Sequence, residues 1–355
     1  MKRKENFIII LCGLCSLLFI YSCQTTKIIT VDYLKPAIVN FPESLKKVGV
    51  VNNAMIDYST QKTSSKWENQ KALLLGDATL ATESLAEHLA SANYFDEVVI
   101  YDSAIKLQED NYQNHSLTPQ EVQDLTEFLQ VDFLVAIENI ILNAEKVEFF
   151  IGEGLIISQL QVEVKANIKS YIPSRSTPIF KDQITDTIYW DLNDPVNFFI
   201  KEKVLVEEAS IFAGEKLASR LVPQWNTAER LLYTSGNKAL KEANKFIKEN
   251  QWNEAFTLWS ELYNTTDREE DKMKASLNIA VYYELMDDFE EAVRWVSIAQ
   301  DIAYKIDGIQ NMNPRLIYNS SNYLPIKNYA ETLKRRKENS FRLEQQMKRF
   351  EDENN

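Results

Sequence analysis

The chain has 355 residues, of which 45% are hydrophobic, and its 39 basic and 52 acidic residues give a formal net charge of −13. This length predicts two domains with additional segments, and the hydrophobic fraction excludes a chain that is disordered throughout. The acidic excess argues against a nucleic-acid partner, because phosphate backbones bind surfaces rich in lysine and arginine. It predicts a well-solvated surface instead.

The first 22 residues have the pattern of a secretory signal peptide. Lys2, Arg3 and Lys4 precede an uncharged run of 15 residues, 7–21. A basic start followed by a hydrophobic run of this length is typical of export signals, and the run is too short to span a bilayer comfortably. We therefore expect residues 1–22 to direct export.

The position of one cysteine predicts a membrane anchor. The hydrophobic run ends at Ile20-Tyr21-Ser22-Cys23. This stretch resembles a bacterial lipobox, in which a small residue precedes the cysteine that is lipidated and becomes the new N-terminus, although Tyr21 departs from the strictest form. The resemblance implies that Cys23 holds the chain at a membrane without spanning it. The alternatives are an ordinary signal peptide cleaved elsewhere, or an uncleaved anchor.

The predicted anchor has two further consequences. Cys12 and Cys15 would leave with the signal peptide, so the mature protein would have neither a disulfide nor a cysteine metal site. The segment Gln24-Thr25-Thr26-Lys27 lacks the acidic run that resembles a surface-export signal in Bacteroidetes. We therefore expect a lipoprotein of the Gram-negative envelope, in the outer membrane and facing the periplasm.

Short hydrophobic strands and amphipathic helices alternate after the anchor. Residues 23–46 are predicted to be a tether that could include a first strand around Ile29. Asp77 is a suitable helix N-cap, and Thr118-Pro119-Gln120-Glu121 is a capping box with proline at the first helical position. These signals predict strands at 47–52, 97–101 and 131–141, and helices at 77–93 and 118–129.

The next segment predicts antiparallel strands. Gly152-Glu153-Gly154 predicts a hairpin turn, and strict alternation of hydrophobic and polar residues over 160–169 marks a strand with one buried face. A further strand is expected at 179–190 and a helix from Asp194 to about Arg220. Together, residues 47–223 predict an α/β sandwich with a mixed sheet. This order of elements resembles the small α/β domain of periplasmic curli-assembly and Tol-associated lipoproteins.

A repeat of 37 residues organises the C-terminal part, 224–306. Seven residues of the first copy match similar residues in the second: Ala243, Phe246, Asn250, Trp252, Glu254, Ala255 and Leu258 against Ala280, Tyr283, Asp287, Phe289, Glu291, Ala292 and Trp295. Each copy predicts a helix, a short polar turn and a second helix, and such units must stack to bury their apolar faces. Helices are expected at 231–247, 252–263, 271–286 and 289–306.

The repeat resembles the tetratricopeptide repeat, whose period is roughly 34 residues. Asn250 and Asp287 stand where that family usually has glycine, and its closing proline is missing. The resemblance implies an all-α region of helical hairpins whose core contains Trp252, Ala255, Trp259, Phe289, Ala292 and Trp295. A ligand-stacking row of tryptophans is the alternative. The family's geometry also implies a partner-binding groove lined by the first helix of each pair, with Asn244, Lys248, Asn278 and Tyr282 in it.

Residues 307–355 predict a loop, a terminal helix over 326–350 and an acidic tail that frays. The basic run Lys334-Arg335-Arg336-Lys337 lies on this helix. We interpret it as a solvated helix face, with contact to a phospholipid or an acidic partner as the alternative.

Motifs for catalysis or cofactor binding are missing from the sequence. His88 and His115 share no metal-ligand spacing, and neither GxGxxG nor a Walker A sequence occurs, so no metal or cofactor is expected. Four aspartates lie close enough in sequence to suggest paired carboxylates for hydrolysis, although edge-strand acids are the ordinary explanation: Asp182, Asp186, Asp191 and Asp194.

Taken together, the lipobox, the Lys35-Pro36-Ala37 entry, the α/β domain and the tryptophan-rich repeats resemble a family of uncharacterised Bacteroidetes lipoproteins. We predict a non-enzymatic envelope lipoprotein that acts as a protein-binding scaffold or assembly factor. A small-ligand or glycan-binding lipoprotein that uses the α/β domain is the first alternative. An unrecognised hydrolase is the second.

Overall fold

A computed structural model of the chain describes residues 26–54, 71–101, 103–105, 116–150, 156–193, 201–313, 317–318 and 320–350. The chain divides into two compact units. The sheet unit contains Leu34–Gln224 and the described residues from Arg342 onward, and the helical unit contains the described residues up to Tyr33 together with Trp225–Phe341. The signal peptide, Cys23, the turn at 152–154, His115 and Asp194 lie outside the described residues.

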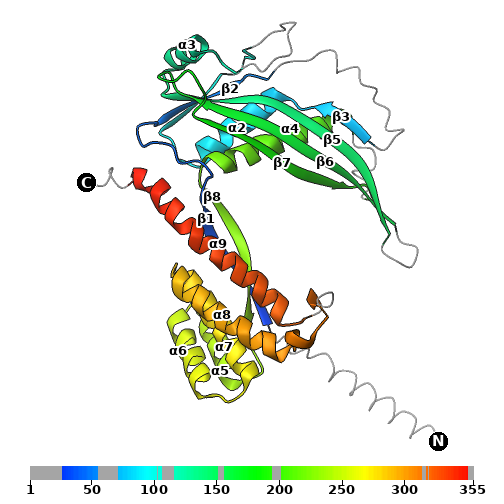
Figure 1. The fold of residues 1–355 in the computed structure, drawn as a ribbon, viewed down its shortest axis with the longest axis vertical. Helices are drawn as coiled ribbons and strands as arrows, with labels where there is room; N and C mark the ends of the chain where they lie inside the picture. The colour runs from blue at the N-terminus through cyan, green and yellow to red at the C-terminus, as the bar shows by residue number, and fades with distance from the viewer. Residues whose placement is uncertain are drawn as a thin grey trace, which may run out of the picture. The chain divides into compact units, whose positions relative to one another are not determined.

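The sheet unit is built on a six-stranded mixed sheet (Figure 1). Its strands are β2 (Lys47–Asn52), β3 (Lys71–Leu75), β4 (Glu97–Tyr101), β5 (Phe133–Phe150), β6 (Ile156–Tyr171) and β7 (Phe180–Asp191). The order is β4-β2-β5-β6-β7, and β3 pairs with β5. Strand β2 is parallel to both of its neighbours, β4 and β5. The pairs β3–β5, β5–β6 and β6–β7 are antiparallel. The even-numbered residues 160–168 of β6 are all buried, as their alternation predicts.

Three helices pack on the two faces of this sheet. Helices α2 (Ala78–Ser91) and α4 (Glu202–Leu221) share one core with the inward residues of β5 and β6, whereas residues of α3 (Pro119–Leu129) join a smaller cluster with the opposite face of β5 (Figure 1). At Gly214 of α4 a Cβ atom would lie 2.5 Å from the carbonyl oxygen of Ala81, so the close approach of α4 to α2 requires glycine there. The predicted α2 N-cap and α3 capping box are confirmed.

The last turns of the C-terminal helix α9 (Tyr323–Met347) belong to the sheet unit from Arg342 onward. The buried side-chain amide of Gln346 donates to the carbonyl oxygens of Ala37 and Val39 and accepts from the Ala37 N–H. Arg349 donates to the Leu45 carbonyl oxygen at 2.9 Å. These contacts satisfy backbone groups of the segment that leads into β2. That segment is not a strand, so its backbone groups have no partners in a neighbouring strand.

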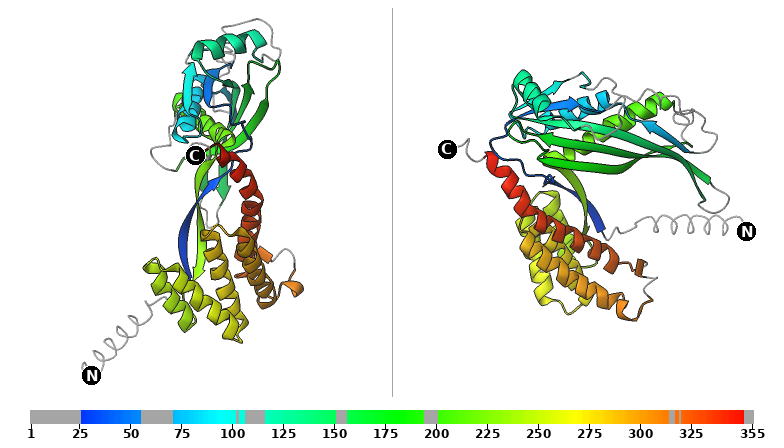
Figure 2. Two further views of the ribbon diagram at one scale, coloured as in Figure 1. Left: turned by 90° about the vertical axis from the view of Figure 1, so that its left-hand side faces the viewer. Right: turned by 45° about the horizontal axis from the view of Figure 1, so that its top comes forward.

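The helical unit begins with a two-stranded ribbon, β1 (Thr26–Lys35) and β8 (Gln224–Tyr233), which lie side by side in both views of Figure 2. Part of the predicted tether is therefore a strand. This strand includes Ile29, where the sequence suggested one. The expected helix from Leu231 is wrong at its start, because β8 continues through Tyr233 and α5 begins only after its N-cap, Asn237. Hydrophobic residues at 231–233 fit a strand as well as a helix, since periodicity cannot distinguish them over so short a run.

Five helices complete this unit: α5 (Lys238–Lys248), α6 (Trp252–Thr265), α7 (Glu269–Leu285), α8 (Phe289–Ile306) and most of α9. Successive helices from α5 to α8 pack on one another, and eleven of the seventeen residues of α7 are buried. The predicted fold class, a mixed α/β region followed by a run of helices, is confirmed. Among the described helices, none combines the length and the hydropathy that crossing a bilayer requires.

The two turns of the 37-residue repeat have the same backbone geometry. Asn250 and Asp287 adopt left-handed φ values of 58° and 56°. The N–H of the next residue donates back to the carbonyl oxygen of Phe246 in the first turn and of Tyr283 in the second, at 2.8 and 3.0 Å. Asparagine and aspartate tolerate this conformation better than other non-glycine residues, which explains how they replace glycine at the helix ends.

Candidate functional site

A carboxylate with no exposed surface lies at the centre of the helical unit. Glu284, on the last turn of α7, accepts two parallel hydrogen bonds from the Arg230 guanidinium of β8, each at 2.7 Å. The hydroxyl of Tyr329 donates to the same carboxylate at 2.7 Å, and Arg336 forms a further ion pair with it. We call these four residues the Glu284 cluster.

Opposite charges keep this carboxyl group ionised. Burial alone would raise the pKa of Glu284, but the hydrogen bonds and charges of Arg230, with Tyr329 and Arg336, hold it below its ordinary value. Burial and the neighbouring Glu284 charge raise the pKa of the Tyr329 hydroxyl well above its usual value. Glu284 is thus a permanently charged acceptor, and its proton affinity is too low for acid–base chemistry at neutral pH.

The helical periodicity of α9 explains why one residue of the basic run is not solvated as expected. Tyr329 and Arg336 are seven residues apart and therefore lie on the same helix face. Within the basic run, Arg336 is directed to Glu284 and stacks over the rings of Tyr33 and Phe289, at 4.6 and 4.7 Å from their centroids. The other three residues of the run are exposed, so the solvated-face interpretation is wrong for Arg336 alone.

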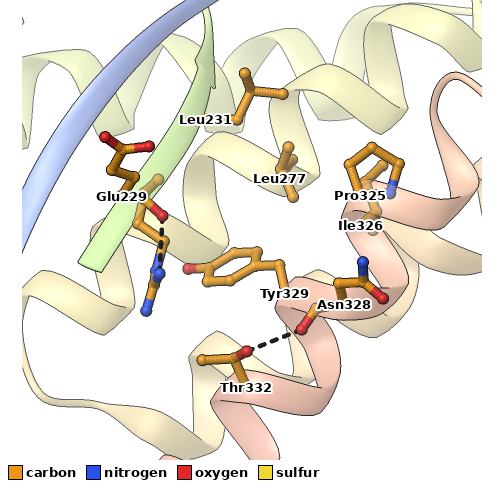
Figure 3. A pocket seen from close by; sticks show the side chains of 9 residues that line it. Glu229, Leu231, Leu277, Pro325, Ile326, Asn328, Tyr329 and Thr332 are labelled. Carbon is orange, nitrogen blue, oxygen red and sulfur yellow. Dashed lines mark hydrogen bonds between the residues drawn. The ribbon is translucent and has the colours of Figure 1, made fainter. Parts of the chain in front are cut away.

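An open pocket of about 260 Å³ adjoins the Glu284 cluster (Figure 3). Its lining comes from β8, α7 and α9: Glu229, Arg230, Leu231, Leu277, Pro325, Ile326, Asn328, Tyr329 and Thr332. The Arg230 guanidinium also donates to the Glu229 carbonyl oxygen, and the Thr332 hydroxyl donates to the Asn328 carbonyl oxygen. Because these bonds fix both sides, the pocket has rigid polar walls around an apolar floor.

The predicted partner groove is not open as expected. Asn278 is fully buried, and its side chain accepts from the N–H of Tyr233 at 2.9 Å and donates to the carbonyl oxygen of Tyr233 at 2.7 Å. The chain's own strand β8 therefore uses the groups that a bound peptide would need. The resemblance could not reveal this, because β8 lies 45 residues before Asn278.

The other three groove residues have separate environments. Tyr282 donates to the Asn253 side chain at 2.8 Å and stacks on Phe256, with ring centroids 4.4 Å apart. Lys248 is exposed at the end of α5, and Asn244 on the same helix is half-buried. The structure does not bring these residues together into a recognition surface.

The predicted repeat-core residues lie in the hydrophobic cluster of the helical unit. Ala255, Trp259 and Ala292 are fully buried, and the half-buried Trp252 and Trp295 pack at its margin. Phe289 is half-buried and lies under the Arg336 guanidinium instead. The Glu284 cluster and the pocket were missed by sequence reasoning. Their residues come from β8, α7 and α9, and no short-range spacing connects them.

A second buried charge cluster lies in the sheet unit. Glu138 is the residue at which the register between β5 and β6 shifts, which makes it part of a β-bulge. Its carboxylate accepts from Lys169 at 3.1 Å, from Tyr171 at 2.9 Å and from Asn53 at 3.1 Å. Asn53 immediately follows β2, so this Glu138 cluster lies at the carboxyl ends of parallel strands, where α/β proteins commonly bind ligands.

The four aspartates of the hydrolase hypothesis do not converge in the part of the chain that the structure describes. Asp182 pairs with Arg220 at 2.8 Å, and Asp186 lies 3.8 Å from Lys216, so both connect β7 to α4. Asp191 accepts from Asn193 in a local turn. Within the described ranges, no group of three His, Cys, Asp or Glu side chains could hold a metal ion.

Comparison with known proteins gives family matches without an assigned activity. Residues 45–233 match a family described as "Domain of unknown function (DUF8603)", and residues 241–335 match one described as "Domain of unknown function (DUF6340)". No curated protein matches the chain.

Two solved structures of the PelC dodecamer from Paraburkholderia phytofirmans are similar to part of the chain. One is 10% identical, covers 56% of this chain and 97% of that chain, and has a TM-score of 0.26. The other, a point variant, is 11% identical, covers 55% of this chain and 100% of that chain, and has a TM-score of 0.25. A similarity at these TM-scores carries no argument about this chain.

Proposed function

The chain belongs to the family described as a domain of unknown function (DUF8603), and we propose that it is a membrane-anchored, non-enzymatic protein-binding module of the cell envelope. The proposal has two parts, a lipid anchor at the N-terminus and a docking pocket in the helical unit. The sequence supports the first part and the geometry of the pocket supports the second.

The pocket beside the Glu284 cluster is the observation that carries the docking function. Its volume of about 260 Å³ is smaller than the roughly 300–1,000 Å³ typical of small-molecule sites. An apolar floor at Leu231, Leu277 and Ile326, enclosed by hydrogen-bonded walls, suits a single large hydrophobic side chain from a partner. Apolar pockets at interfaces receive the few anchor residues that dominate interface energies.

The chemistry of the neighbouring groups favours binding over catalysis. Arg230 uses its guanidinium on Glu284 and on the Glu229 carbonyl oxygen, and Glu284 is held ionised by its partners. A general base needs a pKa near the working pH and access to a substrate proton, and Glu284 has neither. These groups instead stiffen the pocket, because ionic networks of this kind fix side-chain positions.

The anchor in this proposal is an acyl group on Cys23. Its support is the basic start, the 15-residue hydrophobic run and the Ser22-Cys23 junction. We place the lipoprotein in the outer membrane, facing the periplasm, and interpret its helical hairpins as degenerate tetratricopeptide-like repeats of a Bacteroidetes lipoprotein. The acyl group would confine the docking pocket to the membrane surface and to partners found there.

Photo-crosslinking in intact cells tests the docking function. A benzoylphenylalanine in place of the exposed Asn328 at the pocket rim should crosslink to a discrete envelope protein. Thr332→Trp should abolish that product, because the indole would fill the pocket, whereas the matched Thr332→Ser should preserve it. Circular dichroism must show that both variants fold. A product that persists with Thr332→Trp would refute docking through this pocket.

The Glu138 cluster supports a second candidate, small-ligand binding by the sheet unit. Lys169 and Tyr171 bring a cation and a hydroxyl donor to Glu138 of β5, beside the carboxyl end of β2. A panel of sugars and carboxylates should then contain a compound that raises the melting temperature. Lys169→Met should remove the shift, and Lys165→Met, at a half-buried position of the same strand that pairs with Glu163, should retain it.

A further inference from the structure

The pairing of β1 with β8 locates the start of β1 in the helical unit. Asp32 accepts from the Thr227 hydroxyl at 2.7 Å, and β1 and β8 are hydrogen-bonded neighbours. Asp32 lies six residues after the start of β1 and Thr227 six residues before the end of β8, and in Figure 2 the two strands run in opposite directions. The start of β1 therefore lies near the end of β8.

The same end of the ribbon contacts the turn between α8 and α9. The Tyr233 hydroxyl lies 3.4 Å from the side-chain oxygen of Asn322, and the Asn322 amide donates to Asp307 at 2.7 Å. Asp307 follows the last residue of α8 and also accepts from the N–H of Tyr323, the first residue of α9. The start of β1 and this turn consequently share one end of the unit.

Several apolar side chains of β1, α8 and this turn are exposed. Ile28 of β1 is 60% exposed, Ile306 at the end of α8 is 40% exposed, and Tyr318 in the turn is 68% exposed. Tyr304, which is 37% exposed, packs edge-on against the ring of Tyr323. We call Ile28, Tyr304, Ile306 and Tyr318 the Tyr304 surface. Lys305 is exposed between two of its members.

We propose that the Tyr304 surface lies against the lipid headgroups, with its aromatic and aliphatic side chains entering the interface. This inference rests on the proposed lipidation of Cys23. Only Gln24 and Thr25 lie between Cys23 and Thr26, so the acyl group is attached at most about 11 Å from the start of β1. A tether this short brings the end of the unit that contains Thr26 to the bilayer.

The residue types fit that position. Tyrosine rings are favoured at membrane–water interfaces because they combine an apolar body with a polar tip, and lysine extends its charge into the headgroups. Contact through the Tyr304 surface would add to the lipid anchor and would fix the orientation in which the docking pocket meets its partners.

Spin-label accessibility on the full-length lipoprotein in vesicles of its own extracted lipids tests the proposal. Ile306→Cys and Tyr318→Cys each provide one labelling site, because Cys23 is acylated in this proposal. Their nitroxides should collide more often with dissolved oxygen than with a polar nickel complex, which is the lipid-like ratio. Phe341→Cys is the matched control: it is 66% exposed and about 27 Å along α9 from Tyr323, and should give the water-like ratio.

Each outcome decides the question. Water-like ratios at 306 and 318 in a chain whose mass shows an acylated Cys23 would overturn this inference and leave the anchor intact. Absence of the acyl group would overturn both. Nitroxides that collide rarely with both oxygen and the nickel complex would show that protein covers this surface, and would also overturn the inference. Lipid-like ratios in vesicles would support it.

Discussion

Each of the two units holds a carboxylate in a network of hydrogen bonds and charges, and the two networks differ. Glu284 in the helical unit has no exposed side-chain surface and is paired with two guanidinium groups and a phenol. Glu138 in the sheet unit retains 10% exposure and is paired with one ammonium group, a phenol and an amide. The first carboxylate is enclosed by permanent charge, whereas the second is at the margin of its core.

This difference assigns the two clusters different roles. Arginine presents a planar fork that matches a carboxylate at two points, so Glu284 and Arg230 fix α7 against β8 with defined geometry. Lysine is a flexible point charge, and Lys169 divides its bonds between Glu138 and Ser116. The carboxylate of the helical unit is therefore held by a fixed geometry, whereas that of the sheet unit is held through a more flexible cation.

The largest expected effect is the loss of Glu284. Glu284→Ala leaves Arg230 and Arg336 buried without their counter-charge, which should cost about 3–5 kcal/mol of unfolding free energy. Amide exchange in α7 and β8 peptides should accelerate strongly in this variant, as measured by mass spectrometry. Glu290→Ala, at a side chain that is 82% exposed, is the control and should change little. If the amides of α7 and β8 were equally protected from exchange in the Glu284→Ala and Glu290→Ala variants, the Glu284 cluster would not be a main source of stability.

A smaller effect is expected at Glu138. Glu138→Ala removes three hydrogen bonds to a charged acceptor, but Lys169 retains partial access to water, so about 1.5–3 kcal/mol should be lost. The loss should appear in the exchange of β5 and β6 peptides. If this variant destabilises the chain more than Glu284→Ala does, the proposed contrast between the two clusters is wrong.

The two tyrosines refine the comparison. Tyr171→Phe should cost roughly 1–3 kcal/mol, because its hydroxyl both donates to Glu138 and accepts from the buried N–H of Leu117. Tyr329→Phe should cost only about 0.5–1.5 kcal/mol, since Glu284 retains both arginines. Urea denaturation with matched slopes measures both values. The reverse order would show that the phenol is the main partner of Glu284.

The finest test is the acid dependence of stability. Because the folded pKa of Glu284 lies below its unfolded value, the unfolded state takes up the proton first as pH falls. The stability that this ionised group contributes is present above its ordinary pKa and is lost as pH falls through the depressed value. Glu284→Gln should lack this component, so its stability, measured by amide exchange of α7 peptides, should fall less steeply as the pH is lowered. An unchanged pH dependence would mean that other carboxylates dominate the loss of stability in acid.

Much of the fold follows from local patterns. The capping box at Thr118, the alternation along β6 and the 37-residue repeat each depend on residues close in sequence, and each appears in the structure as expected. The repeat alignment even paired Asn250 with Asp287, whose matching left-handed backbones follow from the shared register. Local sterics and hydrogen bonding determine such features, so sequence alone is enough.

Tertiary structure decided the features that carry function. Asn278 appeared available to a partner until β8 occupied its hydrogen-bonding groups, and Arg336 appeared solvated until α9 directed it to Glu284. Arg230, Glu284 and Tyr329 come from three elements separated by 54 and 45 residues, and no periodic signal extends across those distances. Long-range packing decides which of several hydrophobic faces becomes buried. The hydrophobic pattern defines a face but does not identify the element that packs against it.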